Sequence, residues 1–461
     1  MSALLILLAG LLSFAISSSA QPAASNSLTW KAGVSTTVIT PATNMFMAGY
    51  ASRNKPSEGK AQDLFAKALA IEDANGSRMV FVTVDLIGIP RIMRKSLEKR
   101  LLTAHQLKPE QFILNASHTH CGPEFRVGRT PSDEVEFNPT LQGERYGEDL
   151  ENKVFALIGD ALKQLAPSKI AYTHARCGFA MNRRLPLPNG DYRNAPNPDG
   201  PVDHDVPVLR VDGPDGKLRA VLFGYACHNT TLSFYQFCGD YAGFAQEYLQ
   251  ADNPGVTALF MTGCGGDQNP YPRGTIDLAQ KHGRSLATSV EAALFATAKP
   301  LTGSLKSAYA EIDLTYATPP TREELTARLQ SKDKYQVIHA QRMLDRIAKD
   351  GALPKTYPYP VQVVQLGNEV KLIALGGEVV VDYSLRFKRE FGNRGSAVWV
   401  AGYSNDVMGY IPSERILKEG GYEGGGAMLF SPTHPGPWAA GVEEPIANKV
   451  NELDRQVRPN R

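Results

Sequence analysis

The strongest chemical signal in the sequence is a pair of histidines two residues apart, His118 and His120, within residues 115–123 (NASHTHCGP). A short apolar run at residues 112–116 comes directly before them and predicts a strand. Side chains at i and i+2 of an extended chain point to the same face, so both imidazoles can converge on one ion or one substrate. Because neutral imidazole is the commonest zinc ligand, the pair favours a metal site, while a structural, hydrogen-bonding role stays open.

A third histidine, His228, follows another apolar run at residues 220–226. A lone histidine at a strand end is usually a satisfied polar residue, but strand ends are also where an α/β sheet gathers its site. We therefore expect His228 to lie near His118. Asp240 comes a little later and is expected to cap a helix or to orient a ligand histidine through its free ring nitrogen.

A glycine-rich loop, GCGGDQNP at residues 263–270, follows the predicted strand at residues 257–261. It lacks the Lys-Ser/Thr pair of a P-loop and the glycine spacing of a dinucleotide site, which argues against nucleotide binding. We expect the loop to bring its backbone amides and the side chains of Asp267 and Asn269 close to a substrate.

Three further polar residues carry weaker signals by themselves. Glu378 follows a predicted buried strand and is typical of an acid at a helix N-terminus. Tyr410 and Tyr422 lie in glycine-rich surroundings and are typical of packing aromatic residues.

The elements that must position these side chains alternate between strand-like and helix-like patterns. Strands are predicted at residues 65–71, 79–86, 112–116, 209–211, 220–226, 257–261, 361–366 and 370–375, and helices at 92–105 and 146–165. Such alternation predicts an α/β fold: a single large layered domain with mixed β-sheets, flanking helices and the site at strand ends. Two segments rich in Gly, Pro and Asn interrupt it: residues 185–201, predicted to be an irregular loop, and residues 420–437, predicted to be a mobile lid.

Composition excludes several classes of partner. The 49 Lys and Arg residues nearly balance 47 Asp and Glu residues, for a formal charge of +2, so no broad positive field is available for nucleic acid. No segment after the first residues approaches the ~20 apolar residues of a transmembrane helix. The five cysteines are odd in number and widely spaced, which favours free, packed thiols.

The start of the chain resembles a secretory signal. Residues 1–20 combine an apolar run with a small-residue cleavage site and predict a signal peptide, followed by a linker at residues 21–27 and the main folded domain at residues 28–461. Glycosylation sequons occur at Asn75, Asn115 and Asn229. Because glycans on the latter two would block the candidate site, we expect a secreted or periplasmic protein from a bacterial host.

Taken together, these segments resemble the catalytic domain of the neutral, non-lysosomal ceramidase family. The resemblance spans nearly the whole predicted mature chain in order, and the segments that carry it are residues 32–34, 39–41, 47–50, 116–123, 182–183, 227–231, 239–241 and 422–424. It implies a zinc-dependent hydrolase that cleaves an amide bond by attack of a metal-bound hydroxide, with ceramide as the family's default substrate.

The resemblance also implies the roles of individual residues. One zinc ion would be held by four residues: His118, His228, Glu378 and Tyr410. The residues that contact the substrate or polarise its carbonyl would be His120, Arg183 and Tyr422, with His120 or Tyr422 as a donor to the oxyanion.

Two departures from the family separate this chain from a typical ceramidase. The family's Gly-Asp-x-Ser-Pro-Asn loop reads Gly-Asp-Gln-Asn-Pro-Tyr here, so Asn269 stands in place of the serine. Too few residues follow Gly426 for the family's C-terminal immunoglobulin-like domain. Two alternatives therefore stay open: a deacetylase or esterase acting on a carbohydrate or another small acylated substrate, and a non-catalytic, metal-containing protein that binds a lipid or glycan.

Overall fold

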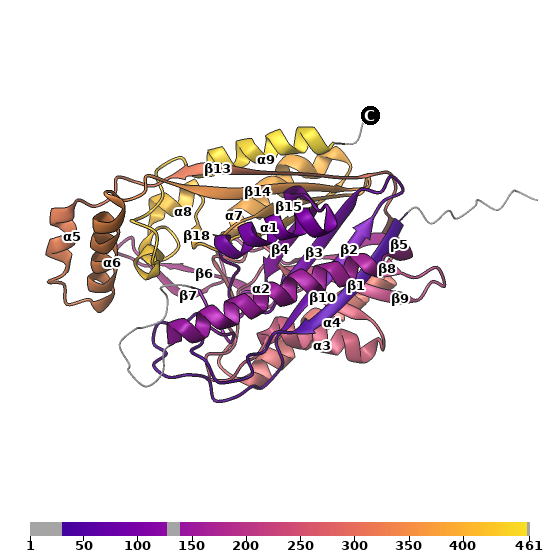
Figure 1. Ribbon diagram of the computed structural model, residues 1–461, viewed down its shortest axis with the longest axis horizontal. Coiled ribbons are helices and arrows are strands. Elements are labelled where there is room, and N and C mark those ends of the chain that lie inside the picture. The colour runs from indigo at the N-terminus through magenta and orange to yellow at the C-terminus, as the bar shows by residue number, and fades with distance from the viewer. Residues whose placement is uncertain (1–29, 127–138, 459–461) are drawn as a thin grey trace, which may run out of the picture.

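The computed structural model describes residues 30–126 and 139–458 (Figure 1). The predicted signal peptide, residues 1–20, and the predicted linker, residues 21–27, lie outside the described residues, so this division of the chain stays a prediction. None of the helices within the described ranges is long and apolar enough to cross a membrane.

The largest sheet is mixed and runs in the order β10-β9-β8-β5-β1-β2-β3-β4, with β12 also paired to β5. Its strands are β1 (Trp30–Val38), β2 (Phe65–Glu72), β3 (Arg78–Val84), β4 (Phe112–Ala116), β5 (Ala166–Arg176), β8 (Asp205–Asp212), β9 (Leu218–Tyr225), β10 (Thr257–Thr262) and β12 (Lys299–Pro300). The pairs β3–β4 and β9–β10 are parallel and the others antiparallel.

A second sheet and two small ones complete the strand layers. The second sheet has the order β13-β14-β15-β17 and a small sheet the order β11-β6-β7, while β16 pairs with β18. The strands are β6 (Ala180–Pro186), β7 (Tyr192–Asn197), β11 (Gln268–Pro270), β13 (Leu305–Thr315), β14 (Thr356–Leu366), β15 (Val370–Leu375), β16 (Glu378–Val379), β17 (Ala397–Ala401) and β18 (Tyr410–Ile411).

Successive side chains of a strand point to opposite sides of its sheet, and both large sheets are buried on both faces. In β2, Ala68 and Ala70 pack in the core beneath α1 and α2, whereas Leu69 packs in a core that the two sheets share. The sheets approach closely there: a Cβ at Gly224 of β9 would lie 2.9 Å from the ring of Trp399 on β17. The two sheets therefore pack face to face.

Helices cover the outer faces and give four layers (Figure 1). On the large sheet, α2 packs on β1 and β2 beside α1, while α3 and α4 cover β8 to β10; on the second sheet, α9 lies over β13 and β14. The helices are α1 (Arg91–His105), α2 (Pro139–Lys163), α3 (Asp240–Asp252), α4 (Ile276–Phe295), α5 (Arg322–Arg328), α6 (Lys334–Asp350), α7 (Val381–Phe391), α8 (Glu414–Glu419) and α9 (Glu443–Val457), with short 3-10 helices η1 (Pro109–Gln111), η2 (Gly392–Arg394) and η3 (Gly426–Phe430). The predicted layered α/β fold is confirmed.

One prediction of an irregular loop is wrong. Residues 185–201 belong mostly to a hairpin in which β6 and β7 pair antiparallel, with Pro186 opposite Tyr192. Leu187 N donates to Asp191 O at 2.8 Å, and Gly190 adopts a φ of +87° in the turn. Since most side chains of β7 are exposed or half-buried, the hairpin shows none of the apolar alternation by which strands are recognised.

Residues 420–437 are also more ordered than a simple loop. They follow α8 and contain η3, and the side chains of Glu423 and His434 are buried. That the segment moves as a lid stays a prediction.

Candidate metal centre

Four chain segments meet at one end of the strands to form the candidate site. His118 lies two residues after β4, and His228 lies three residues after β9. An isolated bridge pairs the two segments through Thr119 and Asn229. Glu378 and Tyr410 come from β16 and β18, where they are direct cross-strand partners.

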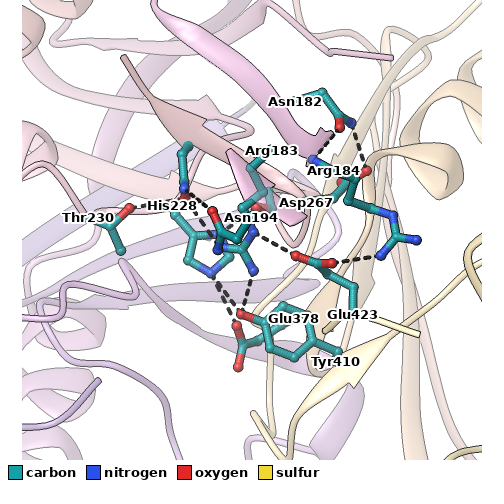
Figure 2. A network of polar contacts seen from close by, with 12 residues as sticks. Asn182, Arg183, Arg184, Asn194, His228, Thr230, Asp267, Glu378, Tyr410 and Glu423 are labelled. Atoms are coloured by element: carbon teal, nitrogen blue, oxygen red, sulfur yellow. Dashed lines mark hydrogen bonds and ion pairs between the residues drawn. The ribbon is translucent and has the colours of Figure 1, made fainter. Parts of the chain in front are cut away.

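The functional atoms of these residues lie within hydrogen-bond range of one another. Oε2 of Glu378 is 3.2 Å from Nε2 of His118 and 3.3 Å from Nε2 of His228. The hydroxyl of Tyr410 is 3.2 Å from Nε2 of His228, and Nε2 of His120 is 3.2 Å from Nε2 of His118. The structure thus brings together all four predicted ligands and His120; Figure 2 shows His228, Glu378 and Tyr410.

The tautomers of two histidines follow from their partners. Nδ1 of His118 is 2.6 Å from the carbonyl oxygen of Ile87, and Nδ1 of His228 is 2.6 Å from that of Gly265. A carbonyl oxygen can only accept a hydrogen bond, so each Nδ1 carries the ring proton and each Nε2 keeps a lone pair. Backbone carbonyls commonly hold metal-ligating histidines in this way.

Three lone-pair atoms therefore face one another in a buried place. Oε2 of Glu378 has no hydrogen-bond partner among the described residues, because the two neighbouring imidazole nitrogens offer lone pairs and no proton. Such a cluster of converging acceptors suits a divalent cation, so these residues fit a metal. Nitrogen atoms of His118, His120 and His228 also lie within 4.8 Å of one another.

Burial keeps both His228 and His120 neutral at physiological pH. Desolvation is the largest cause that lowers the pKa of His228, to about 3, and the nearby guanidinium of Arg183 adds to it. The pKa of His120 is likewise held well below its usual range, first by burial and then by His118 and His228. Neutral imidazole is the form that binds a metal ion.

Tyr410 is a phenol held by an arginine. Its hydroxyl accepts a hydrogen bond of 2.8 Å from Nη2 of Arg183. Burial raises the pKa of Tyr410 well above its ordinary value, even though Arg183 acts in the opposite direction. The ring of Tyr422, which is 41% exposed, lies edge-on to that of Tyr410 with centroids 5.3 Å apart.

Arg183 connects the metal-facing residues to the glycine-rich loop after β10. Its Nη1 donates to Oδ1 of Asn269 at 3.2 Å, and the same oxygen accepts from the hydroxyl of Thr230 at 3.2 Å. Nδ2 of Asn269 lies 3.4 Å from Oδ1 of Asn194. Asn269 is therefore part of a polar corner that also contains Asn194 and Thr230, and Arg183 joins this corner to Tyr410.

His120 is held by a loop that the sequence prediction did not assign to the site. Its ring packs edge-on to Tyr50, with centroids 4.8 Å apart, and Nη1 of Arg53 donates to the carbonyl oxygen of His120 at 2.5 Å. A Cβ at Gly49 would lie 2.4 Å from the His120 ring, and the φ of Gly49 is +99°. Only glycine allows the imidazole to sit where it does.

Asp267, which was expected to approach a substrate, bonds to the protein instead. Oδ1 of Asp267 accepts from the amide of Val381 at 2.8 Å, and its Oδ2 accepts from Nδ2 of Asn182 at 3.1 Å. Burial raises the pKa of Asp267 to about 7. Both of its oxygens hold protein segments together, so the structure does not direct this carboxylate at the metal-facing atoms.

Asp240 bonds an amide at the start of a helix, as one expectation has it, but it does not orient a ligand histidine. It adopts a φ of +54° at the start of α3, and its carboxylate accepts from the amides of Leu232 and Tyr241 at 2.9 and 2.6 Å. It therefore satisfies an amide of the first turn from the first residue of the helix rather than from the N-cap position. It contacts no ligand histidine, because Nδ1 of His118 and Nδ1 of His228 each bond a backbone carbonyl instead.

Two predictions of local geometry also differ from the structure. His118 has a φ of +61° rather than an extended conformation, so the rings of His118 and His120 converge through a turn of the chain. Glu378 starts a two-residue strand, not a helix. The sequence prediction missed Glu423, which accepts a hydrogen bond of 2.7 Å from Nε of Arg183; its place beside Tyr422 in the family-like segment 422–424 was the available signal.

Comparisons with known proteins agree with this fold. Over 94% of the chain and 76% of the other protein, the structure matches that of neutral ceramidase from Pseudomonas aeruginosa with a TM-score of 0.73 at 19% identity. A second solved structure, described as a ceramidase complexed with C2, matches with a TM-score of 0.72 at 18% identity, covering 94% of this chain and 76% of that one. At these identities the likeness concerns the fold alone.

The sequence comparisons cover a smaller part of the chain. Neutral ceramidase B of Dictyostelium discoideum is 25% identical over an alignment of 249 residues, and the match covers 50% of this chain and 33% of that protein. This match therefore spans about a third of the curated relative. The family model described as neutral/alkaline non-lysosomal ceramidase, N-terminal, matches residues 30–290, more than half of the 461 residues. The chain belongs to the neutral/alkaline non-lysosomal ceramidase family.

Proposed function

We propose that this protein is a zinc-dependent hydrolase that cleaves the amide bond of an N-acyl sphingoid lipid, with ceramide cleaved to sphingosine and a fatty acid. The observation that carries the proposal is the convergence of Nε2 of His118, Nε2 of His228 and Oε2 of Glu378, at 3.2 and 3.3 Å, without a proton to share. Membership of the neutral ceramidase family supports the choice of substrate.

The residues proposed to hold zinc are His118, His228, Glu378 and Tyr410. Three of them offer lone pairs in the form observed, whereas Tyr410 is a phenol stabilised by Arg183. When bound there, zinc supplies Lewis acidity, which makes a water molecule nucleophilic near neutral pH and polarises a carbonyl group.

The protein's own side chains then supply proton donors. Because Nε2 of His118 is an acceptor, the proton in the 3.2 Å contact belongs to Nε2 of His120. A substrate oxygen that gains negative charge can accept this proton in a hydrogen bond, since the ring is neutral and fixed by Tyr50. Arg183 donates a hydrogen bond to the hydroxyl of Tyr410, and the partly exposed Tyr422 packs on the ring of Tyr410.

A second candidate is a deacetylase or esterase for a small, polar acylated substrate. The polar corner of Asn269, Asn194 and Thr230 favours it, because an amide side chain there suits a polar group better than an alkyl chain. Ceramide also has a polar head with hydroxyl groups, so the same corner fits the head of the leading substrate.

The test is a panel of N-acyl sphingosines, N-acyl amino acids and acetylated sugars, incubated with the purified protein and followed by mass spectrometry. We expect release of fatty acid from the N-acyl sphingosines, loss of activity after treatment with a chelator, and recovery with zinc. Turnover of acetylated sugars alone would select the second candidate. Bound zinc without turnover of any substrate would show a binding protein instead.

The location of the protein forms a separate proposal. We propose that residues 1–20 are removed on export, that residues 21–27 link the cut to the domain from residue 28 onward, and that the protein works outside the cytoplasm or in a periplasm. Sequencing the N-terminus of the protein isolated from its native cells tests this. An N-terminus at Met1 or Ser2 would contradict it.

A further inference from the structure

A buried carboxylate outside the proposed set of metal ligands, Glu423, connects two parts of the site (Figure 2). It lies in the glycine-rich loop after α8, and its side chain is 3% exposed. Oε1 accepts from Nε of Arg183 at 2.7 Å, and Oε2 accepts from Nη1 of Arg184 at 2.8 Å. Burial would raise the pKa of Glu423, but the two arginines outweigh burial and lower it.

The contact with Glu423 determines where Arg183 can point. A guanidinium group is planar, and its five N–H donors leave in fixed directions. With Nε bound to Glu423, Nη2 reaches the hydroxyl of Tyr410 at 2.8 Å and Nη1 reaches Asn269 at 3.2 Å. Each of the three nitrogens thus has one partner, and the carboxylate is the only charged one among them.

The contact with Arg184 determines where the loop lies. Nη2 of Arg184 also donates to Glu419 at 3.1 Å and to the carbonyl oxygen of Gly420 at 3.0 Å. The loop takes a course that needs glycine, because Gly421 and Gly425 adopt φ values of +73° and +152°. Its ordered course therefore depends on such anchors.

The anchored loop carries an aromatic ring of the site. Tyr422 directly precedes Glu423 and packs edge-on to Tyr410 with ring centroids 5.3 Å apart. The guanidinium of Arg183 lies 6.0 Å from the centroid of Tyr422. One carboxylate thus contacts the arginine that holds Tyr410 and fixes the backbone next to Tyr422.

We propose that Glu423 is a positioning residue. It orients Arg183 toward Tyr410 and Asn269, and it also anchors the 420–426 loop that carries Tyr422. The catalytic part of this inference rests on the proposed hydrolase function. The structural part, the anchoring of the loop, does not.

The test compares Glu423→Gln with Glu419→Gln in the full-length protein. Glutamine at 423 keeps the size of the side chain but removes the charge and turns an N–H group toward one arginine. Glu419→Gln is the matched control, since Glu419 binds the same Arg184 without touching Arg183. Glu423→Asp, a second variant, keeps the charge but is one methylene shorter.

Three readouts separate positioning from simple loss of stability. We expect kcat of Glu423→Gln to fall about 10- to 100-fold, as for other residues that orient functional groups, with zinc content and melting cooperativity retained. Hydrogen–deuterium exchange of the peptide spanning 420–427 should become faster, because the amides of Gly426 and Ala427 bond back to Gly421 and Tyr422. Glu423→Asp should recover part of kcat. Glu419→Gln should keep the kcat and zinc content of the wild type, because Glu419 does not contact Arg183, and it should speed exchange of the loop less than Glu423→Gln does.

Opposite results would overturn the inference. A kcat within twofold of the wild type in Glu423→Gln, or equal losses in the Glu419→Gln control, would exclude a positioning role. Unchanged exchange at 420–427 would exclude the anchoring role. If the wild type turns over no amide or ester, the proposed function fails, while the exchange measurement still decides the role of Glu423 in the loop.

Discussion

Replacement of His228 by alanine is the most direct test of the metal centre. His228 is fully buried, its Nδ1 is held by Gly265, and its Nε2 faces Glu378 at 3.3 Å. The change removes one of three lone-pair donors. Loss of a residue that merely orients a ligand weakens metal binding about 10- to 100-fold, so loss of a direct ligand should cost at least ~100-fold, or about 2.8 kcal/mol.

Weaker zinc binding should also lower the stabilisation of the folded protein by zinc, and therefore its Tm. Zinc at 100 times its Kd stabilises a folded protein by about 2.7 kcal/mol. With an entropy of unfolding of ~2.1 cal/mol/K per residue, this amounts to a rise in Tm of about 3 °C for a chain of this length. A 100-fold weaker site at the same zinc concentration gains only ~0.4 kcal/mol, and its Tm should rise by less than about 1 °C.

The assay is zinc analysis after dialysis against a competing chelator, together with melting curves with and without added zinc. His174→Ala is the matched control, because the side chain of His174 is 62% exposed and pairs with Asp205 rather than with the residues of the candidate metal site. We expect the control to retain zinc, its Tm shift and activity, and His228→Ala to lose all three. Stoichiometric zinc in His228→Ala would refute the metal assignment.

Three further changes test other parts of the structure. Asn269→Ser should raise activity toward ceramide by restoring the hydroxyl that the family carries there; an assay of released sphingosine showing no gain in a folded variant would argue for another natural substrate. Gly49→Ala should lower kcat and destabilise the fold by about 1–3 kcal/mol, because the new Cβ meets the His120 ring at 2.4 Å; denaturant unfolding and unchanged zinc content would check it, and wild-type kcat would contradict it. Burial raises the pKa of Asp406, whose carboxylate accepts from Tyr357, from 3.8 to about 7. The folded state therefore binds the proton more tightly than the unfolded state, and the stabilisation from this group is lost as the pH rises from about 4 to 7. Asp406→Asn should remove up to about 4 kcal/mol of this pH-dependent loss in the free energy of unfolding, and an unchanged pH profile of unfolding would exclude the role of Asp406.

Local patterns were enough to place many of the elements. β4 and β15 occur within the predicted bounds, and α1 begins one residue before its predicted start, because apolar periodicity reflects which faces are buried. The hairpin of β6 and β7 escaped prediction for the same reason, since its side chains are mostly exposed or polar. Apolar periodicity reflects which side chains are buried, so it does not reveal a strand whose side chains are mostly exposed or polar.

By itself, the sequence determined the layered α/β class and the histidine pair after β4, because both depend on residues close together in the chain. Only the tertiary structure decided that Glu378 and Tyr410 are cross-strand partners, that Gly49 makes room for His120, and that Glu423 reaches Arg183 across 240 positions. These contacts come from the packing of segments remote in sequence. No spacing between residues encodes them, since each depends on how separate strands and loops meet at one edge of the sheets.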